Sequence, residues 1–331
     1  MKRIDFENHF YDISFIEALE KRNTPPYYRK ETNTITWTDT ILMPQDKLLP
    51  LLLDMGEERI KLLDKLGIDT AVISSSAGIE ELSTEKGVEV CKRTNDALYE
   101  LTKQFPGRYL GSAILPIQDV DAACAELERC VKELGFVAWH THSNYGDTAL
   151  DDDRYRPIFK KADELGVYVY LHPQLPETSR LSDYGFSLAG PGLGFTVDTM
   201  ISIIRLILSG IFDELPNLTV ILGHLGEALP FLLDRIDNRM KLIPNEFVKN
   251  QHDPSYYFKQ NILVTTSGNM SEAAFKCTKD VLGIDRILFG SDYPYEDAGA
   301  MVSFLDKLPL TEHEKEQLYW KNAKEKLGLE V

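Results

Sequence analysis

Residues 220–239 read VILGHLGEALPFLLDRIDNR, and they contain one complete strand-and-helix unit. The apolar run Leu218–Leu222 is typical of a short buried strand, and the apolar residues that follow it take helical spacing. His224 is therefore predicted to lie where a strand ends and a helix begins. Helical geometry would place Glu227 within reach of the imidazole, and Arg235 on roughly the same side two turns later.

The same unit recurs along the chain. Short apolar strands are predicted over residues 4–6, 70–74, 109–115, 136–139, 167–171, 218–222, 262–265 and 286–289. Helices are predicted over residues 47–66, 83–104, 119–134, 155–165, 197–209, 226 onward, 272–282 and 298–308, and the capping pair Thr311 and Glu314 opens a last helix. Eight buried parallel strands separated by helices close into a barrel, so we predict the α/β class and a (β/α)8 TIM barrel. No linker or repeat divides residues 1–331, which favours a single domain.

The connection after the first strand is unusually long. It runs from Asn23 to Gln45 and carries several aromatic residues together with Arg29 and Lys30. Loops of this length in compact domains tend to be functional. We expect either a lid over a planar anionic ligand or an ordinary packed surface loop.

The balance of charges limits the partners of this chain. Its 331 residues carry a formal net charge of −16. Nucleic acids and anionic membrane surfaces need a basic face, so neither is expected as a partner. The same charge repels an anionic substrate at long range, so a site that binds an acid must reverse the field locally.

The cysteines and the apolar runs indicate a compartment. The four cysteines show no Cys-x-x-Cys pair and no framework spacing, which fits reduced thiols. No signal-peptide core follows the first residues, and no uncharged apolar stretch has transmembrane length. We therefore expect a soluble, cytoplasmic protein.

Polar side chains gather where the predicted strands end. Five of the seven histidines stand there, accompanied by Glu7 and Asp292; these histidines are His9, His140, His142, His172 and His224. In such barrels the chemistry lies at the carboxyl ends of the strands. A lone histidine after a strand is more often structural, but five at such positions favour a functional site.

Two of these groups are expected to point the same way. Glu7 and His9 are two residues apart, so both face one side of an extended strand. With His172 and Asp292 they offer two imidazoles and two carboxylates. Mixed nitrogen and oxygen ligands suit one divalent ion, Zn²⁺ or Mn²⁺.

The segment Leu206–Arg239 resembles the amidohydrolase-related metal-dependent decarboxylases, which include the γ-resorcylate, 2,3-dihydroxybenzoate and 5-carboxyvanillate decarboxylases. Further matches are Glu7–His9, Tyr170–Pro173, Thr265–Asn269 and Phe289–Glu296. The similarity runs nearly end to end, and residues 54–66 and 106–116 resemble the 5-carboxyvanillate branch most.

The resemblance implies a role for each site residue. Glu7, His9, His172 and Asp292 become the metal ligands, and Asp292 also the catalytic proton donor. His224, paired with Glu227, becomes either a proton relay to Asp292 or a group that orients it.

Other roles concern the substrate. Arg235 is expected to bind a carboxylate in the site of a neighbouring subunit, which implies a homodimer or homotetramer. His142 matches a histidine of the carboxyvanillate branch and is expected to contact substrate, while Tyr295 is expected to shape the pocket with Phe195 and Tyr293. His140 belongs either to the core or to the substrate contacts.

The implied reaction is the non-oxidative decarboxylation of a hydroxylated aromatic carboxylic acid, with protonation of the ring carbon before CO₂ leaves. The nearest alternative is a metal-dependent hydrolase of a lactone or cyclic amide. The chain has Glu-x-His where many such hydrolases have His-x-His, and it has no lysine at the end of the fourth strand. A hydratase and a non-catalytic binding barrel are the remaining alternatives.

Overall fold

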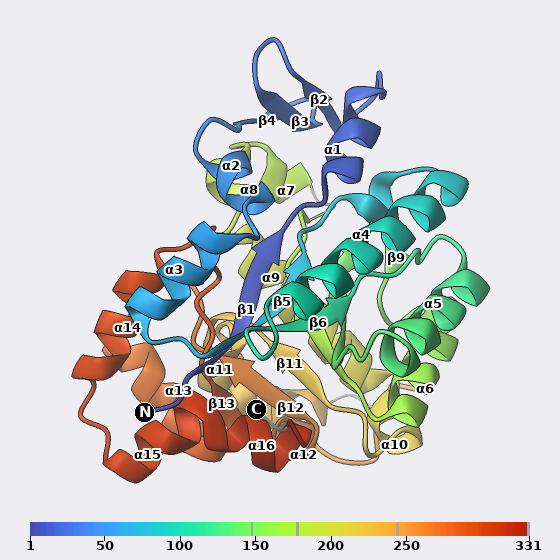
Figure 1. Cartoon of the computed structure of the whole chain (residues 1–331). Helices are drawn as coiled ribbons and strands as arrows, with labels where there is room; N and C mark the ends of the chain where they lie inside the picture. Colours follow the sequence, from blue (N-terminus) through green and yellow to red (C-terminus); the bar gives the residue numbers. More distant parts are fainter. Residues whose placement is uncertain (147, 177–178, 243–244, 330–331) are drawn as a thin grey trace.

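The computed structural model describes residues 1–146, 148–176, 179–242 and 245–329, and its centre is a barrel of eight parallel strands (Figure 1). In spatial order these are β1 (Ile4–Phe10), β5 (Thr70–Ser75), β6 (Tyr109–Ala113), β7 (Ala138–His142), β10 (Tyr168–His172), β11 (Val220–Leu222), β12 (Ile262–Thr265) and β13 (Ile287–Leu288). The predicted (β/α)8 TIM barrel is confirmed.

The first and last strands meet at a seam that nearly closes the barrel. The backbone amide of Phe6 donates to the Phe289 carbonyl at 2.9 Å, and the amide of His9 donates to the Tyr293 carbonyl at 2.8 Å. The pairing of β1 with β5 shifts register between Asp5 and Asn8. Irregularities of this kind re-aim side chains near functional sites, and this one includes Glu7.

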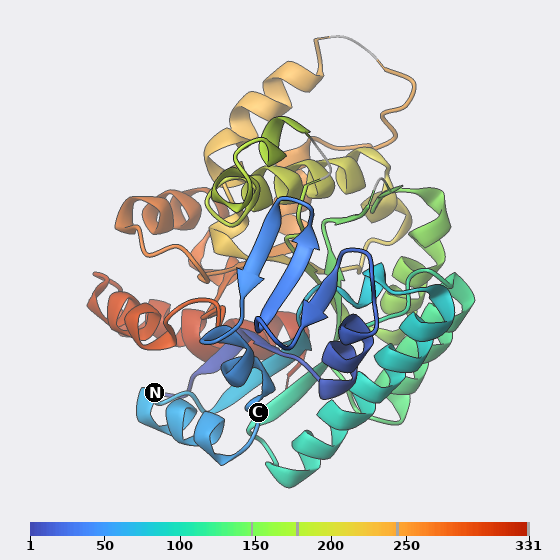
Figure 2. The ribbon, with the colours of Figure 1, turned by 90° about the horizontal axis from the view of Figure 1, so that it is seen from above.

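Helices surround the barrel (Figure 2). The longer ones are α1 (Ile13–Glu20), α3 (Glu57–Leu66), α4 (Thr84–Gln104), α5 (Val120–Lys132), α6 (Arg156–Leu165), α9 (Gly194–Leu208), α11 (Leu229–Met240), α13 (Glu272–Leu282) and α14 (Ala298–Lys307). The shorter ones are α2 (Leu48–Leu53), α7 (Ser179–Ser182), α8 (Phe186–Ala189), α10 (Ile211–Glu214), α12 (Pro254–Gln260), α15 (Glu312–Glu316) and α16 (Asn322–Leu327). None of the helices in the described ranges is both long enough and apolar enough to cross a membrane.

The core has two layers. Outward-facing strand residues such as Trp139 and Val169 pack against the helices, and inward-facing residues such as Val72, Tyr168 and Leu263 fill the barrel. Strands buried on both faces explain the continuous apolar runs in the sequence.

Some predicted boundaries differ from the structure. The predicted helix over residues 47–66 is two helices, because the chain is extended at Asp54 between α2 and α3. β7 continues to His142, so His140 and His142 lie within the strand rather than after it. The predicted strand ended too early because an apolar run stops at the first polar residue. The strand itself continues through His140 and His142, which are buried and face the barrel interior. The capping box of Thr311 and Glu314 is present.

The long connection is a small sheet rather than an irregular loop. Its strands β2 (Tyr27–Arg29), β3 (Thr34–Thr38) and β4 (Ile41–Pro44) pair antiparallel and stand above one end of the barrel (Figure 1). Buried Tyr28 and Ile35 pack in a separate apolar cluster with α1 and α4. This lid sheet, residues 27–44, is therefore a packed part of the fold.

Candidate active site

Glu7, His9, His172 and Asp292 come together at the barrel mouth. One ligand atom from each lies within 4.8 Å of the corresponding atoms of the other three. Two of these residues come from β1, one ends β10, and Asp292 follows β13. The fold thus brings together the four residues that the sequence nominated as metal ligands.

Three atoms of this cluster are buried without a hydrogen-bond partner among the described residues: Glu7 Oε1, His9 Nε2 and Asp292 Oδ1. His9 Nε2 lies 3.1 Å from Asp292 Oδ1 and 3.9 Å from Glu7 Oε1. Leaving buried polar atoms unpaired is costly, and two buried carboxylates repel each other. A divalent cation would satisfy all three atoms, so this donor set fits a metal ion.

Hydrogen bonds select which ring nitrogen of each histidine faces the cluster. His172 Nδ1 lies 2.7 Å from the Pro173 carbonyl, to which it donates, and this leaves Nε2 as the ligand atom. His9 Nδ1 lies 3.3 Å from Ser74 Oγ, which again leaves Nε2 for the cluster. Both rings are held in the orientation that a metal ligand needs.

A hydroxyl network orients Glu7. Thr265 Oγ1 donates to Glu7 Oε2 at 3.0 Å, and it also lies 2.8 Å from Ser267 Oγ and 3.2 Å from the Tyr170 hydroxyl. Thr265 and Ser267 lie in a segment that carried the family resemblance, but the sequence did not indicate that they support Glu7.

Arg59 supports the seam beside the metal ligands. Its guanidinium is buried, donates to the His9 carbonyl at 3.2 and 3.3 Å and to the Leu51 carbonyl at 2.7 Å, and lies 4.5 Å from the Tyr293 ring centre. It therefore joins the end of β1 to the segment after β13. Sequence reasoning missed Arg59 although residues 54–66 carry part of the resemblance, because its role depends on contacts with residues distant in the sequence.

His224 and Glu227 form the predicted pair. His224 Nδ1 lies 2.8 Å from Glu227 Oε1, and Thr196 Oγ1 donates to the other carboxylate oxygen at 2.7 Å. The expected helical turn is absent, because residues 224–226 form a single 3-10 turn and α11 begins only at Leu229.

Backbone strain accompanies this turn. Positive φ angles occur at His224 (54°), Leu225 (59°), Glu227 (60°) and also Asp292 (61°). Residues other than glycine adopt such angles only where the surrounding structure enforces them, often at functional sites. Three of the four strained residues carry side chains of the proposed site.

Electrostatics place a proton on His224 and remove it from Asp292. Burial by itself lowers the pKa of His224, but the Glu227 and Asp292 carboxylates outweigh burial and raise this pKa well above 6.5. Burial raises the pKa of Asp292, but His224 and His9 outweigh it and hold this pKa below its usual value. An imidazolium thus faces a carboxylate, with His224 Nε2 3.9 Å from Asp292 Oδ2.

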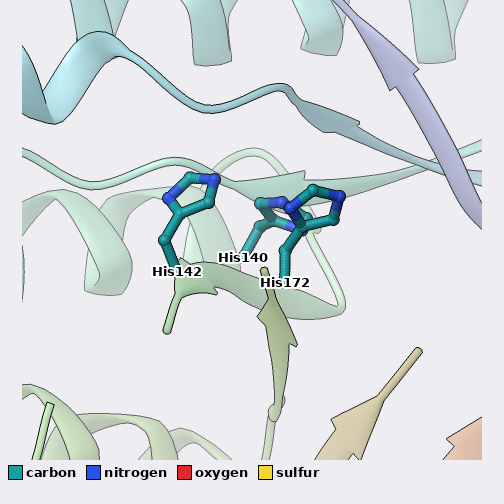
Figure 3. Close-up of side chains that lie close together, drawn as sticks. All are labelled: His140, His142 and His172. Atoms are coloured by element: carbon teal, nitrogen blue, oxygen red, sulfur yellow. The ribbon is translucent and has the colours of Figure 1, made fainter. Parts of the chain in front are cut away.

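His140, His142 and His172 form a second group of imidazoles (Figure 3). Their ring centres are 5.2 to 5.7 Å apart, and the His140 ring stacks on Tyr170 at 5.5 Å. Burial lowers the pKa of His140 well below 6.5 and that of His142 to about 3, so both rings are neutral. His142 Nδ1 lies 3.5 Å from buried Glu80. His172 belongs to both groups, and its ligand nitrogen can bind only one ion. The group of three histidines and the cluster of Glu7, His9, His172 and Asp292 therefore cannot both bind a metal through His172.

A cavity of about 240 Å³ opens beside the candidate metal ligands. His172, His224 and Asp292 line one part, together with Tyr295, whose hydroxyl donates to Ser76 Oγ at 2.8 Å. Apolar side chains line much of the rest; they are Ile35, Trp37, Met43, Leu48, Leu175, Phe186 and Phe195. The lid sheet therefore roofs the cavity.

Several predicted substrate contacts lie elsewhere. His140, His142 and Tyr293 do not line this cavity, and among the described residues neither lysine nor arginine does. Arg29 of the lid instead lies 4.1 Å from the Tyr27 ring centre. Arg235 is exposed on α11, outside the cavity of its own chain.

Comparison with known proteins places this architecture in a family. The family model described as Amidohydrolase matches residues 55–329. A γ-resorcylate decarboxylase from a Rhizobium species is 37% identical over 286 residues, and the match covers 82% of this chain and 87% of that protein.

Solved structures agree with this match. A dihydroxybenzoic acid decarboxylase from a Polaromonas species, with bound manganese and the inhibitor 2-nitroresorcinol, aligns with a TM-score of 0.85 at 31% identity, covering 99% of this chain and 97% of that chain. A 5-carboxyvanillate decarboxylase from Novosphingobium aromaticivorans, with bound manganese and 3-methoxy-4-hydroxy-5-nitrobenzoic acid, aligns with a TM-score of 0.89 at 30% identity, covering 99% and 97%. The chain therefore belongs to the amidohydrolase family.

Proposed function

We propose that this protein is a divalent-metal-dependent decarboxylase of a hydroxylated aromatic carboxylic acid. The observation that carries the proposal is the juxtaposition of two groups, the Glu7, His9, His172 and Asp292 ligand set and the His224 and Glu227 pair. His172, Asp292 and His224 from these groups line one cavity. The largely apolar walls suit an aromatic ring, and the similar solved structures hold manganese with aromatic ligands.

The metal ion and the protein residues have separate roles in the proposed reaction. A bound Mn²⁺ or Zn²⁺ would chelate the phenolic and carboxylate oxygens of the substrate and stabilise negative charge on them. Glu7, His9, His172 and Asp292 would hold that ion. Manganese is the ion seen in the similar structures, and zinc remains part of the proposal because the same donor set suits it.

The chain's residues supply the proton. Glu227 holds the His224 imidazolium in place through Nδ1. The other ring nitrogen of His224, Nε2, faces Asp292 Oδ2. In the proposed step the proton passes from His224 to Asp292, and Asp292 delivers it to the carboxylate-bearing ring carbon. A C–H bond forms there, the bond to the carboxylate breaks, and its electron pair restores the aromatic ring as CO₂ leaves.

We further propose that Arg235 completes the site of a second subunit in a homodimer or homotetramer. The cavity lining contributes acidic side chains, Asp292 and Glu296, but no arginine or lysine from the described part of its own chain. Arg235 is exposed on α11, and Phe231 on the same helix is 80% exposed. Phe231 and Arg235 are four residues apart and therefore lie on the same face of the helix, which suits contact with a second subunit. A neighbouring Arg235 would supply the cation that an acid substrate needs in a chain of net charge −16.

A cytoplasmic location belongs to the proposal as well. All four cysteines, Cys91, Cys124, Cys130 and Cys277, are free thiols, as expected in a reducing compartment.

The test is release of CO₂, with metal analysis of the same preparation. The panel contains the ortho-hydroxybenzoates, 5-carboxyvanillate and simple lactones. Metal-dependent CO₂ release from a hydroxybenzoate supports the proposal. Lactone opening without CO₂ from any aromatic acid would instead mean that the metal activates water, as in the hydrolases of the wider superfamily.

A further inference from the structure

Gln45 presents a side chain to the cavity from a fixed backbone. It follows β4, is 2% exposed, and lines the cavity from the lid side. Its amide donates to the Asn33 carbonyl at 2.8 Å, and its carbonyl accepts from Leu49 at 3.2 Å. A side chain on a backbone held from both sides is a stable part of a binding site.

The orientation of the Gln45 side-chain amide follows from its neighbour. Nε2 donates to the Met43 carbonyl at 3.1 Å. If the Gln45 amide were flipped, Oε1 would face the Met43 carbonyl oxygen, which is unfavourable. The Met43 carbonyl therefore fixes Nε2 as its donor and leaves Oε1 without a partner in this contact. Oε1 is buried and has no partner among the described residues. A buried acceptor without a donor is unfavourable, and because Gln45 lines the cavity, a ligand bound there can supply the donor.

A second glutamine in the lining provides a contrast. Gln174 donates through Nε2 to Glu80 at 2.6 Å and accepts through Oε1 from the Leu175 amide at 2.9 Å. Its amide is committed within the protein. Gln45 therefore has the side-chain amide oxygen that is left for a ligand.

The surroundings of Gln45 define what that ligand group is. The roof is otherwise apolar, with Ile35, Trp37 and Met43, and the lining also contains the Glu296 carboxyl. An uncharged hydroxyl can donate to Oε1. A methoxy oxygen and a second carboxylate have no proton to donate, and the carboxylate would also lose its hydration against apolar walls.

We propose that Gln45 is a specificity residue whose Oε1 accepts a hydrogen bond from a second ring hydroxyl of the substrate. The inference rests on the proposed function and narrows it to dihydroxybenzoates with one carboxylate. It assigns a recognition role to the lid, and it disfavours 5-carboxyvanillate, which carries a methoxy group and a second carboxylate.

The experiment compares the wild type with Gln45→Met, which keeps an unbranched chain of similar length. The substrates are the dihydroxybenzoate isomer that the wild type prefers and 2-hydroxybenzoate, which lacks the second hydroxyl. We expect Gln45→Met to lower kcat/KM about 10- to 100-fold on the first substrate and to change it less than about 3-fold on the second. Equal losses on both substrates, or no loss, would overturn the role of Gln45.

Two further measurements keep the outcome clear. Met43→Leu changes the same roof without touching a polar side chain, and it should affect both substrates alike. Replacing the second hydroxyl by methoxy should cost the wild type at least about 10-fold in kcat/KM, which tests the inference without any variant. Equal rates for the hydroxyl, methoxy and unsubstituted acids would refute the inference alone, whereas absence of CO₂ from every acid would refute the proposed function.

Discussion

His224 Nδ1 lies 2.8 Å from Glu227 Oε1, and the opposite ring nitrogen of His224 faces Asp292. The two carboxylates raise the pKa of this partly buried imidazole well above 6.5. In the proposed reaction His224 therefore holds the proton next to Asp292, the carboxylate that delivers it to the substrate.

Glu227→Gln should lower kcat about 10- to 100-fold, because the amide no longer stabilises the imidazolium. Bound metal per subunit should stay the same, since Glu227 is outside the ligand set. Thr196→Val, which removes only the hydrogen bond to Glu227, should show a smaller loss. Unchanged kcat in Glu227→Gln would remove His224 from the proton path.

Asp292→Asn should lower kcat by at least about 1,000-fold, because it removes both a proposed metal ligand and the group that delivers the proton in the proposed reaction. Metal content and CO₂ release are measured on the same sample. If the variant is reloaded with Mn²⁺ to full occupancy and turns over like the wild type, Asp292 has no part in proton transfer.

Removal of the metal should abolish CO₂ release and also destabilise the fold. The carboxylates of Glu7 and Asp292 then face each other without a cation. Return of Mn²⁺ at 100 times its Kd should stabilise the native state by about 2.7 kcal/mol. The melting temperature is measured against Mn²⁺ concentration, and a value that does not change with Mn²⁺ would argue against a metal at this cluster.

Arg235→Met should chiefly raise KM for the aromatic acid, because a carboxylate loses its charged partner. Arg239→Met is the matched control, since Arg239 is an exposed arginine on the same helix. Sedimentation at micromolar concentration tests the assembly. A monomer with full activity would contradict the shared site.

Glu80→Gln should make stability less dependent on pH. Burial raises the pKa of Glu80 from 4.5 to about 7, and its side chain is 4% exposed. The folded state therefore keeps the proton that the unfolded chain releases. This contribution to stability is fully present below pH 4.5 and is lost as the pH rises to 7, a loss of about 3 kcal/mol.

Urea unfolding at pH 4.5 and pH 7.5 measures the difference between wild type and Glu80→Gln. The wild type should lose stability relative to the variant at the higher pH. A difference that is the same at both pH values would show that Glu80 does not titrate in this range.

The strand pattern was sufficient to predict the barrel, because buried parallel strands leave continuous apolar runs in the sequence. The same pattern placed the end of the fourth strand too early in the prediction. His140 and His142 are polar, yet they belong to the strand and face the barrel interior. Composition gave no sign of a lid sheet in the connection. Its strands are three to five residues long and pack on a local cluster.

The sequence nominated the four residues that cluster at the barrel mouth and the His224 and Glu227 pair, but it did not predict the backbone that places them, and His142, Tyr293 and Arg235 lie outside the cavity. The spacing predicted a helical turn between His224 and Glu227. In the structure the two side chains meet because the backbone takes positive φ angles at His224, Leu225 and Glu227. Arg59 and Gln45 escaped notice because their roles depend on long-range contacts, with the His9 carbonyl and with the cavity. A single sequence does not encode such contacts as a local pattern.

In the proposed reaction a ring carbon is protonated before CO₂ leaves. The most direct measurement follows turnover of the dihydroxybenzoate isomers by the Mn²⁺-loaded enzyme in D₂O. This reaction gives one CO₂ for each phenol formed, with one deuterium at the vacated ring carbon and no turnover after the metal is removed by chelation. Absence of CO₂ and of ring deuterium from every aromatic acid, with lactones opened by the same preparation, would contradict it.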